Sequence, residues 1–175
     1  SDIQLANATA IAMFNVTGAT INNNCIEHTN VSYNGRRGIN ADGLQTATIN
    51  NNTVNLGASG ATNVDGAWMI QLSMSDRDLQ NVSVNGNTIT GGYSAITTLS
   101  QRNVSNVTIA NNVISSASIG VTLNGGSATP VISQPQQSNI SIINNKISTV
   151  TPTVSGARSE EHTSELQSQF RISYA

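Results

Sequence analysis

The chain has 175 residues and a formal net charge of −2, and charged and aromatic residues make up only 9% and 3% of it. This length suffices for one domain with a sizeable core. The near-neutral charge excludes the basic footprint of a nucleic-acid-binding protein, no stretch is apolar for long enough to span a bilayer, and the single cysteine excludes an intrachain disulfide framework.

An asparagine-rich pattern recurs five times along the chain. The copies read ATINNNCI (19–26), ATINNNTV (47–54), VSVNGNTI (82–89), VTIANNVI (107–114) and ISIINNKI (140–147). Each copy has an alternating apolar segment, a bend at the asparagines and a second alternating segment, which predicts a strand, a tight turn and a strand. The helical period is absent, so helical solenoids are excluded.

One asparagine is constant in all five copies. It stands at Asn24, Asn52, Asn87, Asn112 and Asn145. One unit cannot bury its apolar side chains alone, but stacked units turn the flanking Ile and Val positions into continuous interior columns. Asparagine tolerates the left-handed conformation of a sharp turn, and Gly86 fits a strained position in it. Stacked asparagines can also bond to one another, which favours a structural ladder over a sugar-binding row.

These copies resemble the repeats of the pectin-lyase-like superfamily over roughly residues 3–150. The resemblance implies an all-β fold, a right-handed parallel β-helix of about five turns, with residues 1–157 as a single truncated domain. It also implies an extracellular, cell-surface or virion location. The family includes polysaccharide lyases, polygalacturonase-type hydrolases, alginate epimerases, phage tailspikes and adhesins, so the fold leaves the activity open.

Two overlong intervals between repeats, 27–44 and 61–79, hold most of the charge that lies outside residues 158–175, and they are expected to form functional loops. The first contains Asn40-Ala41-Asp42-Gly43, which resembles the Asn-Thr-Asp-Gly signature of polygalacturonase-type hydrolases. Asn63-Val64-Asp65-Gly66 repeats this spelling. The resemblance implies that Asp42 and Asp65 are catalytic carboxylates on adjacent turns. The family's Gly-His-Gly and Arg-x-Lys motifs are not found, and Asn-x-Asp-Gly is also a common turn sequence.

Four residues near these motifs are candidates for substrate binding: Arg36, Arg37, Asn40 and Trp68. Arginine pairs well with carboxylates, so the arginine pair fits a uronate-bearing polysaccharide, although a solvated loop pair is the simpler interpretation. Trp68 fits a sugar-stacking platform, but it stands in an apolar run that is equally typical of packing.

No cofactor is expected. The sequence Asp76-Arg77-Asp78 offers too few carboxylates for a calcium shell. A lone histidine such as His28, beside Glu27, is more often solvated than a base or a metal ligand. Cys25 occupies a variable, outward position of the repeat, so it is not a candidate nucleophile.

Residues 158–175, RSEEHTSELQSQFRISYA, depart abruptly from the repeat composition. The stretch resembles a translated sequencing adapter of the Illumina type, in which Arg158 to Ser168 and Ile172 to Ala175 match two constant adapter segments. We therefore interpret it as an artefactual tail outside the fold, and we expect the natural protein to continue past Ala157.

The sequence thus favours recognition, with or without cleavage, of an extracellular polysaccharide by a hydrolase or lyase of the pectin-lyase-like type. The alternative is a non-catalytic β-helix spike, adhesin or surface-layer repeat. A monomer is expected, or a trimer if the chain comes from a tailspike, with no nucleic-acid partner and no insertion into a membrane.

Overall fold

The computed structural model describes residues 2–5, 9–28, 37–55, 68–74, 77–100, 102–124, 137–149 and 170–171. Within these ranges the chain forms seventeen strands and no helix. The ranges accordingly contain no helix with the length and hydrophobicity that a membrane crossing requires. The prediction of an all-β chain is confirmed.

The strands form three sheets, which we name A, B and C. In spatial order, sheet A contains β1 (Asp2–Leu5), β4 (Cys25–His28), β7 (Thr53–Asn55), β10 (Thr88–Thr90), β13 (Val113–Ala117) and β16 (Lys146–Thr149). Sheet B contains β14 (Ile119–Asn124), β11 (Ser94–Ser100), β8 (Trp68–Met74), β5 (Arg37–Asp42) and β2 (Thr9–Phe14). Sheet C contains β17 (Phe170–Arg171), β15 (Gln137–Ile143), β12 (Val104–Ala110), β9 (Leu79–Asn85), β6 (Gln45–Asn50) and β3 (Thr20–Asn22).

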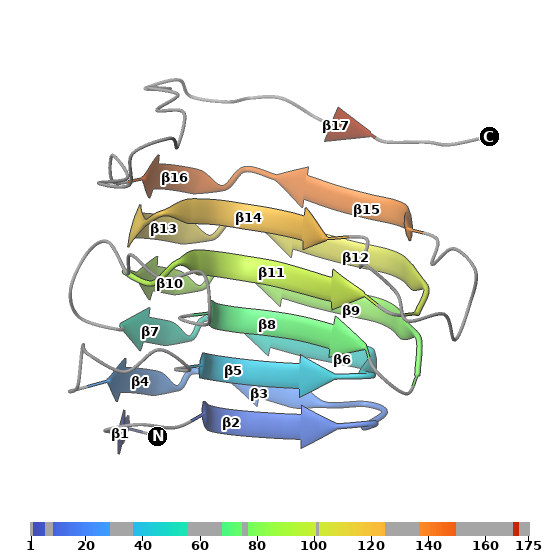
Figure 1. Ribbon diagram of the computed structural model, residues 1–175, viewed down its shortest axis with the longest axis horizontal. Coiled ribbons are helices and arrows are strands. Elements are labelled where there is room, and N and C mark those ends of the chain that lie inside the picture. Colours follow the sequence, from blue (N-terminus) through green and yellow to red (C-terminus); the bar gives the residue numbers. More distant parts are fainter. Residues whose placement is uncertain are drawn as a thin grey trace.

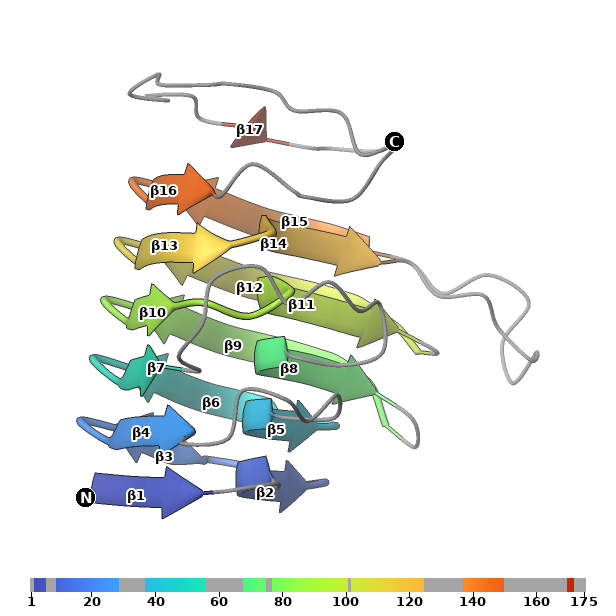
Figure 2. The same ribbon diagram turned by 60° about the vertical axis from the view of Figure 1, so that its left-hand side comes forward.

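From β1 to β16, consecutive strands belong to sheets A, B and C in turn, so neighbours within a sheet come from successive turns (Figure 1). Every pairing is parallel except that of β17, which pairs antiparallel with β15. The turned view shows the strands stacked in layers around a common interior (Figure 2). This arrangement fits a parallel β-helix solenoid.

The asparagine repeats lie at the corner between sheets C and A. In the copy at 19–26, for example, β3 precedes the asparagine turn and β4 follows it. The residue before each constant asparagine has a positive φ: Asn23 (57°), Asn51 (54°), Gly86 (67°), Asn111 (54°) and Asn144 (54°). Asparagine and glycine are the residues that adopt this left-handed conformation at least cost, which explains why the turn is spelled with them.

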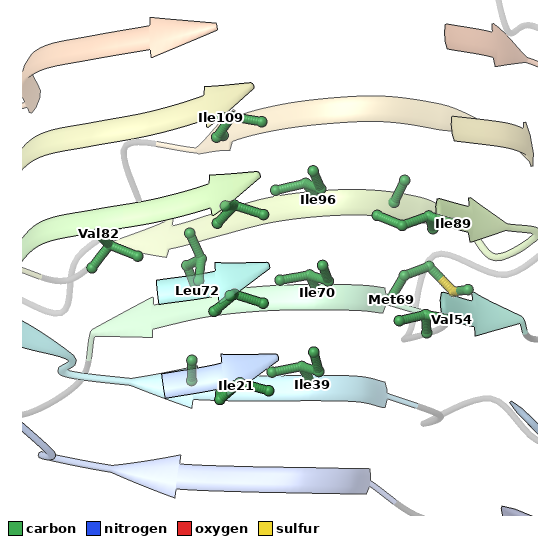
Figure 3. Close-up of a cluster of buried hydrophobic side chains, with 14 of the residues drawn as sticks. Ile21, Ile39, Val54, Met69, Ile70, Leu72, Val82, Ile89, Ile96 and Ile109 are labelled. Carbon is green, nitrogen blue, oxygen red and sulfur yellow. The ribbon is translucent and has the colours of Figure 1, made fainter. Parts of the chain in front are cut away.

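The apolar positions of the repeat form the predicted interior columns. Ile21, Ile49 and Val84 are Cα partners on successive strands, and all three are buried. A second buried column, which contains Ile39, Ile70 and Ile96, lines the inner face of sheet B (Figure 3). Fully burying one such side chain stabilises the fold by about 1.5–3 kcal/mol relative to leaving it exposed.

The two intervals expected to be functional loops also contain strands, which is a correction. The segment 27–44 includes β5, and 61–79 includes β8, so both intervals supply sheet B. The motif Asn40-Ala41-Asp42 is therefore part of a strand, and only Gly43, with φ +61°, leaves it. Of the functional candidates, four stand on strands of sheet B rather than on a loop: Arg37, Asn40, Asp42 and Trp68.

Candidate functional site

The five constant asparagines form a continuous ladder of side-chain hydrogen bonds. The backbone N–H and the Nδ2 of Asn52 both donate to Oδ1 of Asn87, at 2.9 and 3.0 Å. Asn87 donates to Asn112 in the same way, at 2.9 Å from each nitrogen. Asn24 donates likewise to Asn52, and Asn112 to Asn145.

From Asn52 to Asn145, each ladder amide also donates to a backbone carbonyl of sheet C one turn earlier. Nδ2 of Asn87 donates to the carbonyl oxygen of Ile49 at 2.8 Å, and Nδ2 of Asn112 donates to that of Val84 at 3.0 Å. Asn52, Asn87 and Asn112 are almost completely buried. Their polar atoms are used within the fold, so they are not accessible for contact with a sugar.

The outer face of sheet B brings together the three predicted binding residues that the structure describes, Arg37, Asn40 and Trp68. Met69 and Ile70 are consecutive in β8 and both are fully buried, so the usual alternation of a strand breaks between them. Trp68 and Gln71, on either side, therefore share the outer face. The same irregularity occurs in β5. Arg37 pairs with Trp68 and Ile39 pairs with Ile70, and the register skips the one residue that lies between them in each strand.

Arg37 and Trp68 are direct partners in the register of β5 and β8. The guanidinium carbon of Arg37 lies 5.2 Å from the centre of the Trp68 ring, which is the geometry of a cation–π contact. Both side chains are half-buried. The contact fixes the direction of a long, flexible cation and presents it beside an aromatic ring.

Asn40 and Gln71 form the next pair along the same two strands. They expose only 8% and 5% of their surface, although they face away from the core. Oε1 of Gln71 is buried and has no hydrogen-bond partner, and such an acceptor costs about 1–3 kcal/mol while it stays unsatisfied. Asp42 follows two residues after Asn40, is half-buried, and pairs with Ser73.

Gln71 belongs to neither the asparagine repeat nor the Asn-x-Asp-Gly sequences, so it was not among the predicted site residues. The sequence nevertheless marks Gln71 as unusual, because it is the one polar residue in the run Trp68 to Leu72. A polar side chain in a strand whose neighbours are buried requires a partner.

Several predicted residues lie outside the described part of the chain, among them Arg36 and Asp65. The structure therefore does not give the distance between Asp42 and Asp65. In the segment Asp76-Arg77-Asp78, Asp78 accepts hydrogen bonds from Asn103, and Arg77 donates to the backbone oxygen of Asn15. Within the described ranges no three acidic, histidine or cysteine residues gather closely enough to hold a metal ion.

Cys25 lies half-buried in β4. Its Cα partners along sheet A are Thr53, Thr88, Val113 and Lys146, each reached through the strand before it. These four side chains are exposed. The position is thus an outward one, as the repeat alignment predicts.

No protein-family model matches the chain, and comparisons with curated proteins and with solved structures found no significant match.

Proposed function

We propose that the outer face of sheet B recognises an extracellular polysaccharide that carries carboxylate groups. The observation that carries the proposal is the contact between Arg37 and Trp68. An arginine held in a fixed direction forms strong paired hydrogen bonds with a carboxylate, and an indole ring offers an apolar platform for a sugar. Gln71 lies next to this pair in the same row, but it is only 5% exposed, so it is not a direct contact for the sugar.

Binding tests this proposal directly. We expect the wild-type chain to bind polygalacturonate or alginate oligosaccharides, and to bind a neutral dextran much more weakly. Arg37→Ala should weaken binding at least tenfold, which corresponds to about 1.4 kcal/mol. Lys146→Ala is the matched control, because Lys146 is an exposed cation on sheet A. Equal losses in the two variants would mean that only overall charge matters, and the proposed face would be wrong.

Cleavage is the second part of the proposal. Asp42 would act as an acid or base together with Asp65 of the second Asn-x-Asp-Gly sequence, in the manner of glycoside hydrolases. We expect Asp42→Asn to lower the release of new sugar ends by about 100-fold or more while leaving binding nearly unchanged. A wild-type chain that binds the oligosaccharide without cleaving it would favour a non-catalytic spike, adhesin or surface-layer repeat instead.

The buried ladder is the specific observation that favours this alternative. Its hydrogen bonds run without interruption from Asn24 to Asn145, as befits a rod whose function is to extend and present a surface. The chain would then act as a monomer, or as a trimer if it belongs to a tailspike.

We also propose that the solenoid is right-handed and related to the pectin-lyase-like superfamily. Each turn connects two parallel strands of one sheet, and such crossovers are right-handed in about 98% of cases. Residues 158–175 remain, in this proposal, a translated adapter. Their one described strand, β17, pairs with Ser141 and Ile142 of β15, in the opposite direction to every other pairing of the sheet.

A further inference from the structure

The outer face of sheet C differs from the other two sheets because its parallel strands carry no charge. The sequences of β3, β6, β9, β12 and β15 are TIN, QTATIN, LQNVSVN, VSNVTIA and QSNISII. They contain no acidic, basic or aromatic residue. By contrast, sheet B carries Arg37 and Asp42, and sheet A carries Glu27 and Lys146.

A column of hydroxyl groups crosses this face, one on each parallel strand. Its members are Thr20, Thr48, Ser83, Thr108 and Ser141, which are Cα partners in successive pairings. Each stands between two apolar residues of the chain that face the interior, so it points outward. Thr20 is exposed and the other four are half-buried.

The neighbouring asparagines on this face are occupied with one another. Nδ2 of Asn106 donates to Oδ1 of Asn81 at 3.0 Å, and Nδ2 of Asn139 donates to Oδ1 of Asn106 at 3.1 Å. These three residues share the same left-handed backbone conformation, with φ between 52° and 55°. Together they form a second asparagine ladder, which is exposed. In the described ranges the five hydroxyl groups make no such bond, so their hydrogen-bonding capacity faces the solvent.

The spacing of the hydroxyl column is fixed by the strands. Neighbouring strands lie about 4.7–4.9 Å apart, so the hydroxyl groups repeat at this spacing along the stack. The branched Cβ of Thr20, Thr48 and Thr108 also restricts the rotamers of these three side chains. The absence of charge disfavours an ionic polymer, and the absence of aromatic rings disfavours sugar stacking. The ligand that matches this face is therefore a neutral, regularly spaced lattice of hydrogen-bonding groups. Ordered water can supply such a lattice, because it bonds to protein groups nearly as well as they bond to one another.

We propose that the hydroxyl column of sheet C binds the surface of ice. Water molecules held at a regular spacing by the five hydroxyl groups would join the crystal lattice, and the five parallel strands carry no charged side chain that would disturb their orientation. This activity is independent of the polysaccharide site, which lies on a different sheet.

The test is uptake of the full-length, fluorescently labelled chain into slowly growing ice. The wild type should be enriched in the ice fraction relative to a protein of similar size that does not bind ice. Thr48→Lys should lower the enrichment at least about tenfold. The lysine ammonium group would lose its hydration at the ice surface and would find no opposite charge there to compensate. The matched control is Thr88→Lys, because Thr88 is an exposed, outward threonine on sheet A.

Exclusion of the wild type from ice would overturn the proposal. So would equal loss in Thr48→Lys and Thr88→Lys, provided that circular dichroism shows both variants folded. Size-exclusion chromatography gives a further check. If the wild type forms a dimer that Thr48→Lys disrupts, the face is an interface between two copies of this chain, and the ice proposal fails.

Discussion

The buried asparagine ladder predicts a large loss of stability for Asn87→Ala. Oδ1 of Asn87 accepts two hydrogen bonds from Asn52, and its Nδ2 donates to Ile49 and Asn112, all between 2.8 and 3.0 Å. Four bonds at about 1 kcal/mol each give a loss of about 4 kcal/mol. The backbone N–H of Asn52 would also be left buried without its acceptor, which adds to the loss.

The assay is equilibrium unfolding in urea, followed by circular dichroism at constant protein concentration. The control is Asn24→Ala at the end of the ladder, where Nδ2 donates to Asn52 at 2.9 Å and to Asn22 at 3.2 Å in partly exposed surroundings. We expect a loss of about 1 kcal/mol for the control. If Asn87→Ala costs no more than Asn24→Ala, the ladder does not stabilise the fold as the hydrogen bonds indicate.

Three further predictions concern glycines and the tail. Gly38→Ala should lower the free energy of unfolding by about 1–3 kcal/mol, because the added Cβ would lie 2.6 Å from the backbone oxygen of Met69. An unchanged urea midpoint would contradict the close packing between β5 and β8. Gly86→Ala should cost about 1–2 kcal/mol because of its positive φ, and Gly86→Asn should cost less, as asparagine occupies this position in the other turns; the reverse order would count against the left-handed turn. Deletion of 158–175 should shift the melting temperature by less than about 2 °C, whereas a clear loss would show that the tail belongs to the fold.

The ladder and its interior columns were predictable because the repeat keeps every apolar residue at a fixed offset from one asparagine. The second, exposed ladder was equally readable and was missed. Asn81, Asn106 and Asn139 each stand six residues before a constant asparagine. Their side chains bond along the sheet for the same geometric reason as the buried ones.

Sheet B was not predictable from the repeat. Its strands have unrelated sequences, such as RGINAD in β5 and WMIQLSM in β8. They also lie at varying distances along the chain from the constant asparagines of the repeat. Two consecutive interior residues, Met69 and Ile70, also break the alternation by which a strand is recognised. The contact between Arg37 and Trp68 follows only once the turns are stacked, because the two residues are far apart in the sequence.

The central functional claim is that the outer face of sheet B is the binding surface. NMR titration of the isotopically labelled chain with an oligogalacturonate tests it most directly. We predict saturable shifts of the Trp68 indole N–H, the Arg37 side chain and the Gln71 amide, with little change at Thr48 on sheet C or Thr88 on sheet A. Shifts centred on either of those sheets, or no shifts at millimolar oligosaccharide, would contradict the account.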